Sequence, residues 1–249
     1  MAALFDTHCH LFMEPVASCL QLVMERSRAA DVTRFLVPAV SRETWDQCAA
    51  LARLPGVKCA LGIHPWFAGE GVDKYELEER IIAEGAVAVG EIGLDWKCAT
   101  DQATQKEVFR DQLRIAEKLS IPVSLHCRGA FHEMLSILDD YSVSGAVHAW
   151  SRDPELMERF LQRGLFISFG GAVTRKGARR ARASALAVPS DRFILETDSP
   201  SIGLSGIQAG ESEPSHLTMV LEAMAAIREE SPEETAELAF ANSTTLFGD

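Results

Sequence analysis

The stretch AVAVGEIGLD, residues 86–95, decides the fold class of this 249-residue chain. Its apolar beginning is typical of a strand that is buried on both faces, and the carboxylate Glu91 follows directly. A carboxylate that enters an apolar interior is costly unless it is paired or binds a metal ion. The stretch therefore predicts a buried strand that carries either a metal ligand or the partner of an arginine.

Four other apolar runs carry a potential metal ligand in the same way. They are LFDTHCH with His8 and His10, VSLHCR with His126, GAVHAW with His148, and FILETDSP with Asp198. Residues two apart in a strand face the same side, so His8 and His10 point together. A lone histidine is more often a core residue, and Asp198 before Ser-Pro could be a simple turn former. Four histidines and two carboxylates at strand ends nevertheless predict one metal centre built from many strands.

Eight strand-like runs alternate with helical segments, which predicts a parallel sheet. Eight such units in about 250 residues is the size of a (β/α)₈ barrel, and we expect a single domain over residues 1–249. A doubly wound open sheet is the alternative, but it would gather its ligands at one switch point. The runs are LFDTH, RFLVPAV, KCALGIHP, AVAVGEIG, PVSLHC, GAVHAW, LFISFGG and RFILETD.

Helix signals lie between these runs. Apolar residues recur at helical spacing over Pro15–Ala30 and over Gln102–Leu119. Asp153-Pro154 and Ser231-Pro232 are strong helix starts, with a capping side chain followed by proline in the first turn.

Composition narrows the class of protein. Hydrophobic residues make up 47% of the chain and the formal net charge is −12, which argues against a protein that coats nucleic acid. No apolar run approaches the roughly 20 residues that span a membrane, and the first strand-like run begins directly after the N-terminus. The six cysteines contain no C-x-x-C pair, so we expect reduced thiols in a cytoplasmic protein. We expect a monomer.

Six ligands exceed the three and a water that one catalytic zinc needs. They suit two divalent ions that share a bridging carboxylate, about 3.5–4 Å apart, an arrangement well matched to the hydrolysis of phosphodiesters. Mixed imidazole and carboxylate sites accept Zn²⁺, Mn²⁺ or Mg²⁺, so the identity of the metal stays open.

The motifs, in their order along the chain, resemble those of TatD-type metal-dependent deoxyribonucleases, within the amidohydrolase-like barrels. The resemblance covers essentially the whole chain. It rests on DTHCHL (6–11), GIHP (62–65), GEIGLD (90–95), PVSLHCR (122–128), ETDSP (196–200) and the final ANSTTLF (241–247).

The resemblance implies roles for the matching residues. His8, His10 and Asp198 would hold one ion, His126 and His148 the other, and Glu91 would bridge them. Asp198 would also orient, or take a proton from, the attacking water. His64 and Arg128 would contact the scissile phosphate, and a guanidinium is well shaped for that contact. The implied activity is cleavage of DNA from its ends, of the 3′ to 5′ exonuclease type, on single strands or 3′ termini.

Two loops depart from the family pattern. The family usually has H-C-F-S-G where residues 148–152 read HAWSR, and it has an aromatic residue and R-N-E-P where residues 199–215 keep only Glu-Pro. The ligand His148 is retained, but the family pattern no longer indicates which residues of these loops contact the substrate.

Aromatic and basic residues near the motifs bear on the substrate. Trp66, Trp96 and Trp150 each follow a motif residue, and we expect at least one to stack on a base, although packing against the rim is the alternative. Residues 175–182 form the densest basic run, either a phosphate-binding loop or a solvated helix face.

Two other functions remain open. The same site could hydrolyse C–N or ester bonds in a small molecule or an aminoacyl-tRNA, since a metal centre polarises a carbonyl as readily as a phosphoryl group. A non-catalytic metal-binding scaffold is the third possibility, and the intact ligand set argues against it.

Overall fold

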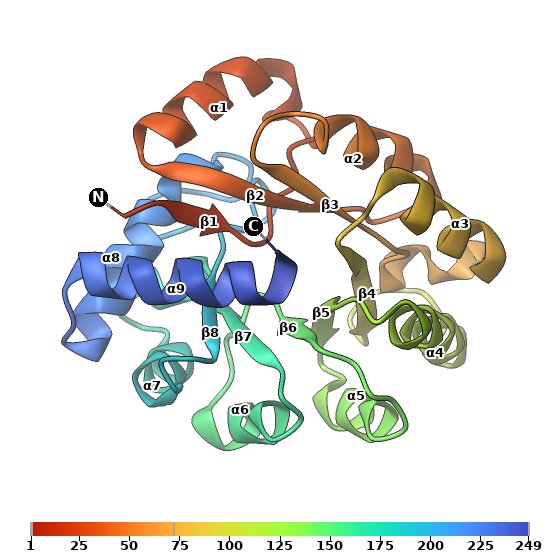
Figure 1. Ribbon diagram of the computed structural model, residues 1–249. Coiled ribbons are helices and arrows are strands. Elements are labelled where there is room, and N and C mark those ends of the chain that lie inside the picture. The colour runs from red at the N-terminus through yellow and green to blue at the C-terminus, as the bar shows by residue number, and fades with distance from the viewer. Residues whose placement is uncertain (1, 72, 249) are drawn as a thin grey trace. The chain divides into compact units, whose positions relative to one another are not determined.

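The computed structural model describes residues 2–71 and 73–248. Its strands pair in parallel, and the sheet order follows the chain from β1 to β8 (Figure 1). This is the strand order of the (β/α)₈ barrel predicted from the sequence. The chain divides into two compact units, residues 1–37 with 148–249 and residues 38–147, and each is described by itself.

The first unit contains both ends of the chain. Backbone hydrogen bonds join the end of β8 to β1, from Thr7 N to Leu195 O (3.1 Å) and from Asp198 N to His8 O (2.8 Å). Its elements are β1 (Leu4–Asp6), η1 (Ala17–Cys19), α1 (Leu20–Ala29), β2 (Val32–Pro38), α6 (Pro154–Leu161), β7 (Phe166–Phe169), η4 (Gly171–Thr174), α7 (Arg179–Ala187), β8 (Phe193–Leu195), η5 (Pro214–His216), α8 (Leu217–Arg228) and α9 (Pro232–Phe247).

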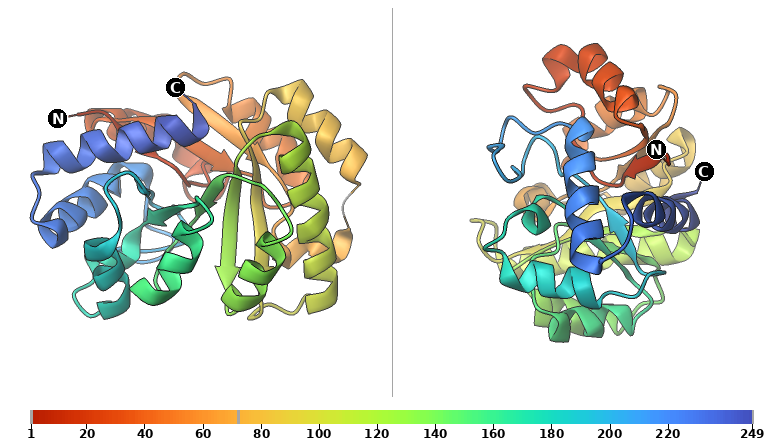
Figure 2. Two further views of the ribbon diagram at one scale, coloured as in Figure 1. Left: turned by 60° about the horizontal axis from the view of Figure 1, so that its bottom comes forward. Right: turned by 90° about the vertical axis from the view of Figure 1, so that its left-hand side faces the viewer.

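Helix α9 supports the strand that leads to Asp198. The Asn242 amide on α9 donates to the carbonyls of Ser190 and Phe193 (2.9 and 2.8 Å), which fixes the start of β8. Figure 2 shows α9 beside α8, the helix before it in the chain. The final sequence motif, residues 241–247, therefore holds the strand that leads to Asp198.

The second unit consists of β3 to β6 with their helices. Its elements are η2 (Arg42–Thr44), α2 (Trp45–Leu51), β3 (Val57–Leu61), η3 (Pro65–Glu70), α3 (Lys74–Glu84), β4 (Ala88–Asp95), α4 (Gln102–Leu119), β5 (Val123–Arg128), α5 (Phe131–Leu138) and β6 (Gly145–Val147).

Two buried glutamines on α4 fix the ends of neighbouring strands. Gln112 exchanges two hydrogen bonds with the backbone of Ile63 (2.7 and 3.1 Å), directly before His64. Gln105, two turns earlier, exchanges two with the backbone of Asp95 (2.8 and 3.0 Å), at the end of β4. A helix side chain thus satisfies the backbone groups of each strand end where the ladder stops.

The helix predictions are confirmed over residues 102–119, and the Asp153 and Ser231 side chains cap α6 and α9 as predicted. The helix expected over Pro15–Ala30 is broken: η1 begins at Ala17 and α1 at Leu20, because Cys19, the last residue of η1, has non-helical backbone angles. No helix among residues 2–71 and 73–248 is both long and apolar enough to cross a membrane.

Candidate metal centre

His8, His10 and Asp198 form a compact donor group in the first unit. One possible ligand atom of each lies within 4.8 Å of the others, and all three residues are buried. The His10 Nε2 is 3.4 Å from the Asp198 Oδ1. The structure thus brings together the three residues that the family resemblance assigns to one ion.

A second donor group shares His8 and adds His148 and Glu196. The His8 and His148 rings stack with centroids 4.0 Å apart and an interplanar angle of 9°. The His148 Nδ1 lies 3.8 Å from the Glu196 Oε1 and 3.9 Å from the Asp198 Oδ2. His148 therefore faces both carboxylates that follow β8.

Glu196 was not among the ligands predicted from the sequence. It is fully buried; its Oε1 accepts the Ala149 backbone N–H and its Oε2 accepts the Ser168 hydroxyl, each at 2.5 Å. The signal was present, because Glu196 and Asp198 are two residues apart at the end of a strand, as His8 and His10 are.

Backbone hydrogen bonds between segments far apart in the chain hold this group in place. Asp198 has a positive φ of 52°, an uncommon conformation for a residue with a side chain, and Ala149 next to His148 has a φ of 50°. The Asp198 N–H donates to His8 O, and the His10 N–H donates to Ser199 O (2.7 Å). Backbone strain of this kind is common at functional sites, where surrounding structure enforces it.

Charges around the carboxylates decide their protonation. Burial alone would raise the pKa of Asp198, but the hydrogen bond from His10 and the nearby His8 and His148 imidazoles hold it below its usual range. Asp6 shows the opposite balance, since burial raises its pKa to about 8 despite hydrogen bonds from Thr197. Asp198 is thus the charged carboxylate, as a metal ligand should be.

The third donor group lies in the second unit and consists of His64, Glu91 and His126. The Glu91 Oε1 is 3.0 Å from the His126 Nδ1 and 3.4 Å from the His64 Nε2. The Glu91 carboxylate therefore lies beside two imidazoles. His64 was expected to contact phosphate, and the structure places it beside two possible metal ligands, Glu91 and His126. Its contact with phosphate stays a prediction.

Glu91 does not lie at the end of its strand. Strand β4 continues to Asp95, paired with β5 from Ile92 onward, and the pairing register shifts between Val89 and Ile92. The Glu91 N–H donates instead to Ala39 O (2.8 Å). This irregularity places a carboxylate in mid-strand without breaking the sheet.

Asp95 lies beside the third donor group and contacts His126 and Trp66. Its Oδ2 accepts the Trp66 indole N–H (2.7 Å) and lies 3.5 Å from the His126 Nε2. Burial would raise the pKa of Asp95, but these contacts and the Lys97 backbone N–H hold it well below its usual range. The Arg128 Nη1 is 4.0 Å away, and its side chain is 62% exposed, so Arg128 is accessible to a substrate.

The three tryptophans have different environments. Trp150 is 1% exposed and packs edge-to-face on Phe160 (5.6 Å), so it is not available for stacking on a substrate. Trp96 is half-buried, whereas Trp66 is 54% exposed with its ring edge-to-face on His64 (5.0 Å). Of the three, Trp66 alone presents an open indole beside a donor group.

The donor sets fit divalent cations. Buried imidazole and carboxylate side chains that converge within bonding range of a common point, and that are oriented by further carboxylates, are the usual surroundings of Zn²⁺ and Mn²⁺. The roles of the six predicted ligands, including the bridging role of Glu91, stay predictions.

Comparison with known proteins agrees with these features. A family model for TatD-related DNases matches residues 5–248. The chain is 31% identical to the uncharacterized metal-dependent hydrolase YabD of Bacillus subtilis, over 98% of each protein. It is 33% identical to the 3′-5′ ssDNA/RNA exonuclease TatD of Cronobacter sakazakii, over 90% of each.

The fold is also that of a solved relative. The crystal structure of the TatD homologue YJJV from Escherichia coli aligns with a TM-score of 0.92 and 30% identity, covering 99% of this chain and 98% of that one. The predicted fold class is therefore confirmed.

Proposed function

Since the chain belongs to the family of TatD-related DNases, we propose that this metal-dependent hydrolase cleaves phosphodiester bonds in single-stranded nucleic acid from the 3′ end. The observation that carries the proposal is the convergence of imidazole and carboxylate donors in each unit, around Asp198 and around Glu91. The polarity and substrate of cleavage follow the name of the Cronobacter sakazakii relative.

The proposed chemistry divides between the cations and the side chains. A divalent cation supplies Lewis-acid catalysis, because it polarises a phosphoryl oxygen and offsets the charge that develops on it. His8, His10 and Asp198 hold one cation, and Glu91 with His126 helps to hold a second. The Asp198 carboxylate also orients the attacking water, for which its lowered pKa keeps it ionised.

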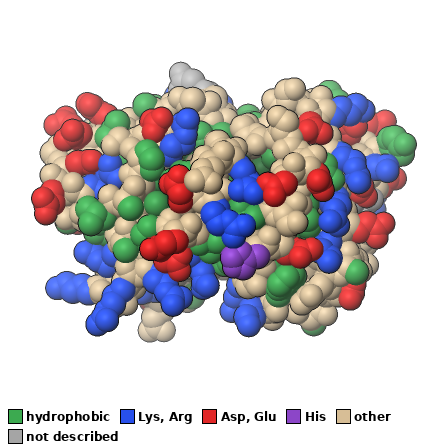
Figure 3. Space-filling model, turned by 90° about the horizontal axis from the view of Figure 1, so that it is seen from below, with side chains coloured by type: hydrophobic (Ala, Val, Ile, Leu, Met, Phe, Trp, Pro, Cys, Tyr) green, Lys and Arg blue, Asp and Glu red, His purple; other side chains and the backbone are tan. Residues whose placement is uncertain are grey.

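Two side chains near Glu91 favour a nucleic-acid substrate. Arg128 offers an accessible guanidinium, which can form two parallel hydrogen bonds to phosphate. Trp66 offers an exposed aromatic face, on which bases stack without regard to sequence. The net charge of −12 is no obstacle, because acidic and basic side chains are interspersed on the face in Figure 3 and bound cations add local positive charge.

A nuclease assay with a metal series tests the proposal. A 5′-labelled single-stranded oligonucleotide should shorten progressively from its 3′ end with Mg²⁺, Mn²⁺ or Zn²⁺, and Glu91→Ala should abolish the reaction. Glu107→Ala, an exposed carboxylate on α4, is the matched control and should retain full activity.

The same protein should be tested against amide and carboxylic ester substrates. Hydrolysis of those substrates with no cleavage of any phosphodiester would replace the proposal with the C–N or ester hydrolase. Metal binding without any hydrolysis would leave only a scaffold.

A further inference from the structure

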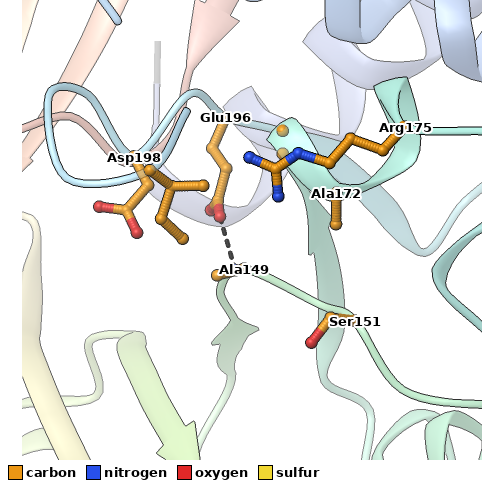
Figure 4. Close-up of a pocket in the computed structure, with 9 residues that line it drawn as sticks. Ala149, Ser151, Ala172, Arg175, Glu196 and Asp198 are labelled. Atoms are coloured by element: carbon orange, nitrogen blue, oxygen red, sulfur yellow. Dashed lines mark hydrogen bonds between the residues drawn. The ribbon is translucent and has the colours of Figure 1, made fainter. Parts of the chain in front are cut away.

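A cavity of about 200 Å³ adjoins the carboxylates that follow β8. Its wall includes Glu196 and Asp198 on one side and the loop after β7 on the other (Figure 4). Figure 4 shows the Arg175 guanidinium directed from that loop toward the two carboxylates. All nine residues that line the cavity belong to the first unit.

The cavity is lined by two acidic side chains, Glu196 and Asp198, and one basic side chain, Arg175. Both carboxylates belong to donor groups that fit a cation, and both Glu196 oxygens also accept hydrogen bonds. The other lining residues apart from Arg175 are neutral: Ala149, Ser151, Gly170, Gly171, Ala172 and Ile202. Once cations occupy the donor groups, Arg175 provides the only positively charged side chain among these nine.

Arg175 has donors to spare. Among residues 2–71 and 73–248 its side chain makes one hydrogen bond, from Nη2 to the Gly203 carbonyl (2.6 Å), and no ion pair. A guanidinium carries five N–H donors in a planar fork that matches the oxygens of phosphate. The contact to Gly203 orients this fork and leaves most of it for a ligand.

The loops after β7 and β8 are built to leave this space open. A Cβ on Gly171 would come within 2.3 Å of the same Gly203 carbonyl, and a Cβ on Gly170 would come within 3.2 Å of the Glu196 Cγ. Any larger residue would push apart the two segments that carry Arg175 and the carboxylates. The glycines therefore preserve both the cavity and the anchor of Arg175.

We propose that Arg175 binds a phosphate group of the substrate in this cavity, a phosphate other than the one that is cleaved. The proposal rests on the phosphodiesterase function proposed above and makes Arg175 a specificity-determining residue. Loops after the seventh and eighth strands of such barrels are frequent phosphate sites. The substrate class is thus a phosphodiester with at least one additional phosphate, as in an oligonucleotide.

Equilibrium binding without turnover tests Arg175 directly. With a divalent cation present, the affinity for a fluorescein-labelled phosphorothioate oligothymidylate that resists cleavage is measured by anisotropy at several salt concentrations. Arg175→Ala should weaken binding about tenfold and reduce the slope of log K against log salt by about 0.7, the value for one phosphate contact on a single strand. Lys176→Ala, the same charge one residue along but outside the cavity lining, should change both less.

A second variant separates the phosphate contact from loop structure. Arg175→Gln can still donate to the Gly203 carbonyl but lacks the charge, so it should fold with the wild-type melting temperature and still show the weaker binding and the reduced salt slope. Wild-type affinity and slope in both Arg175 variants would overturn the proposal.

Activity distinguishes this proposal from the function on which it rests. With metal, Arg175→Ala should raise KM for the oligonucleotide but leave the hydrolysis of a nitrophenyl ester of a mononucleotide, which has a single phosphate, nearly unchanged. Equal losses on both substrates would overturn the Arg175 proposal while the nuclease function stands. If binding depends on Arg175 but the protein cleaves no phosphodiester, the phosphate contact of Arg175 stands and the proposed nuclease function is overturned.

The bound phosphate can be internal or terminal. Repeating the anisotropy series with and without a terminal phosphate on the probe separates these sources. A loss in Arg175→Ala that is confined to the phosphorylated probe identifies a terminal phosphate, and an equal loss on both probes identifies an internal one. No loss on either probe contradicts the proposal.

Discussion

The indole N–H of Trp66 is hydrogen-bonded to the buried Asp95 carboxylate at 2.7 Å, although the Trp66 side chain is 54% exposed. An exposed aromatic ring is thereby fixed in orientation by a charged acceptor, since hydrogen bonds to charged groups are about twice as strong as neutral ones. The ring is ordered before any substrate arrives, which lowers the entropic cost of stacking on it.

Trp66→Ala should therefore weaken the binding of single-stranded oligonucleotides. Stacking contributes about 1–3 kcal/mol per base, so we expect a rise in Kd of about 5- to 150-fold. Trp66→Phe keeps a ring but loses the hydrogen bond, and should lie between Trp66→Ala and wild type. Tyr75→Ala, which removes another exposed aromatic ring from the same unit, is the control, and an equal effect there would contradict the prediction.

Asp95→Asn should weaken metal binding although Asp95 is not among the predicted ligands. His126 lies between Glu91 and Asp95, with one ring nitrogen toward each. Losing a carboxylate that orients a metal-binding imidazole typically costs about 10- to 100-fold in metal affinity. Calorimetric titration of the metal-free protein with Zn²⁺ or Mn²⁺ measures the change, and Asp111→Asn on α4 provides a control with unchanged affinity.

Divalent cations should raise the melting temperature of the metal-free protein. A ligand at a hundred times its Kd stabilises the folded state by about 2.7 kcal/mol, which corresponds to about 5–10 °C for a chain of this length. His10→Ala should lose most of this increase, because it removes one of the donors around Asp198. His132→Ala, an exposed histidine on α5, should retain it. An undiminished increase in His10→Ala would show that the cation binds elsewhere.

The ion pair between Glu213 and Arg26 should make stability depend on acid pH. Burial would raise the pKa of Glu213, but the two hydrogen bonds from Arg26 hold it below its usual value of 4.5. A carboxyl group with a lowered folded-state pKa stabilises the protein fully above its unfolded-state pKa, and this stabilisation is lost as the pH falls through the folded-state pKa. The loss should therefore begin below about pH 4.5.

Urea unfolding at pH 7 and at successively lower pH measures this effect. Glu213→Gln should be less stable than wild type at pH 7, and the difference should shrink as the pH falls. A difference that stays constant with pH would assign the loss to packing and not to the charge.

The sequence predicts the donors better than their grouping. Period-two spacing correctly places His8 beside His10, and the same rule applied to residues 196–198 would have found Glu196. The position of Glu91 in mid-strand was not predictable, because it depends on a register shift in the pairing of β4 with β5. Burial of Trp150 was equally hidden, since it results from contact with Phe160 on the following helix.

The orientation of Arg175 could not be predicted from the sequence, for a different reason. Its sequence neighbours identify it only as part of a basic run, whereas its orientation comes from the carbonyl of Gly203, 28 residues further along the chain. Contacts over that separation follow from how the loops fold over one another, and no local pattern records them.

The hydrogen bond from Asp198 N to His8 O joins residues that are 190 positions apart in the chain. At roughly 5–20 residues per second, a ribosome needs on the order of 10–40 seconds to deliver Asp198 after His8. During that interval the two N-terminal histidines exist without their carboxylate, and the donor group cannot yet assemble. A cation site that needs both His8 and Asp198 can thus form only after most of the chain has been synthesised.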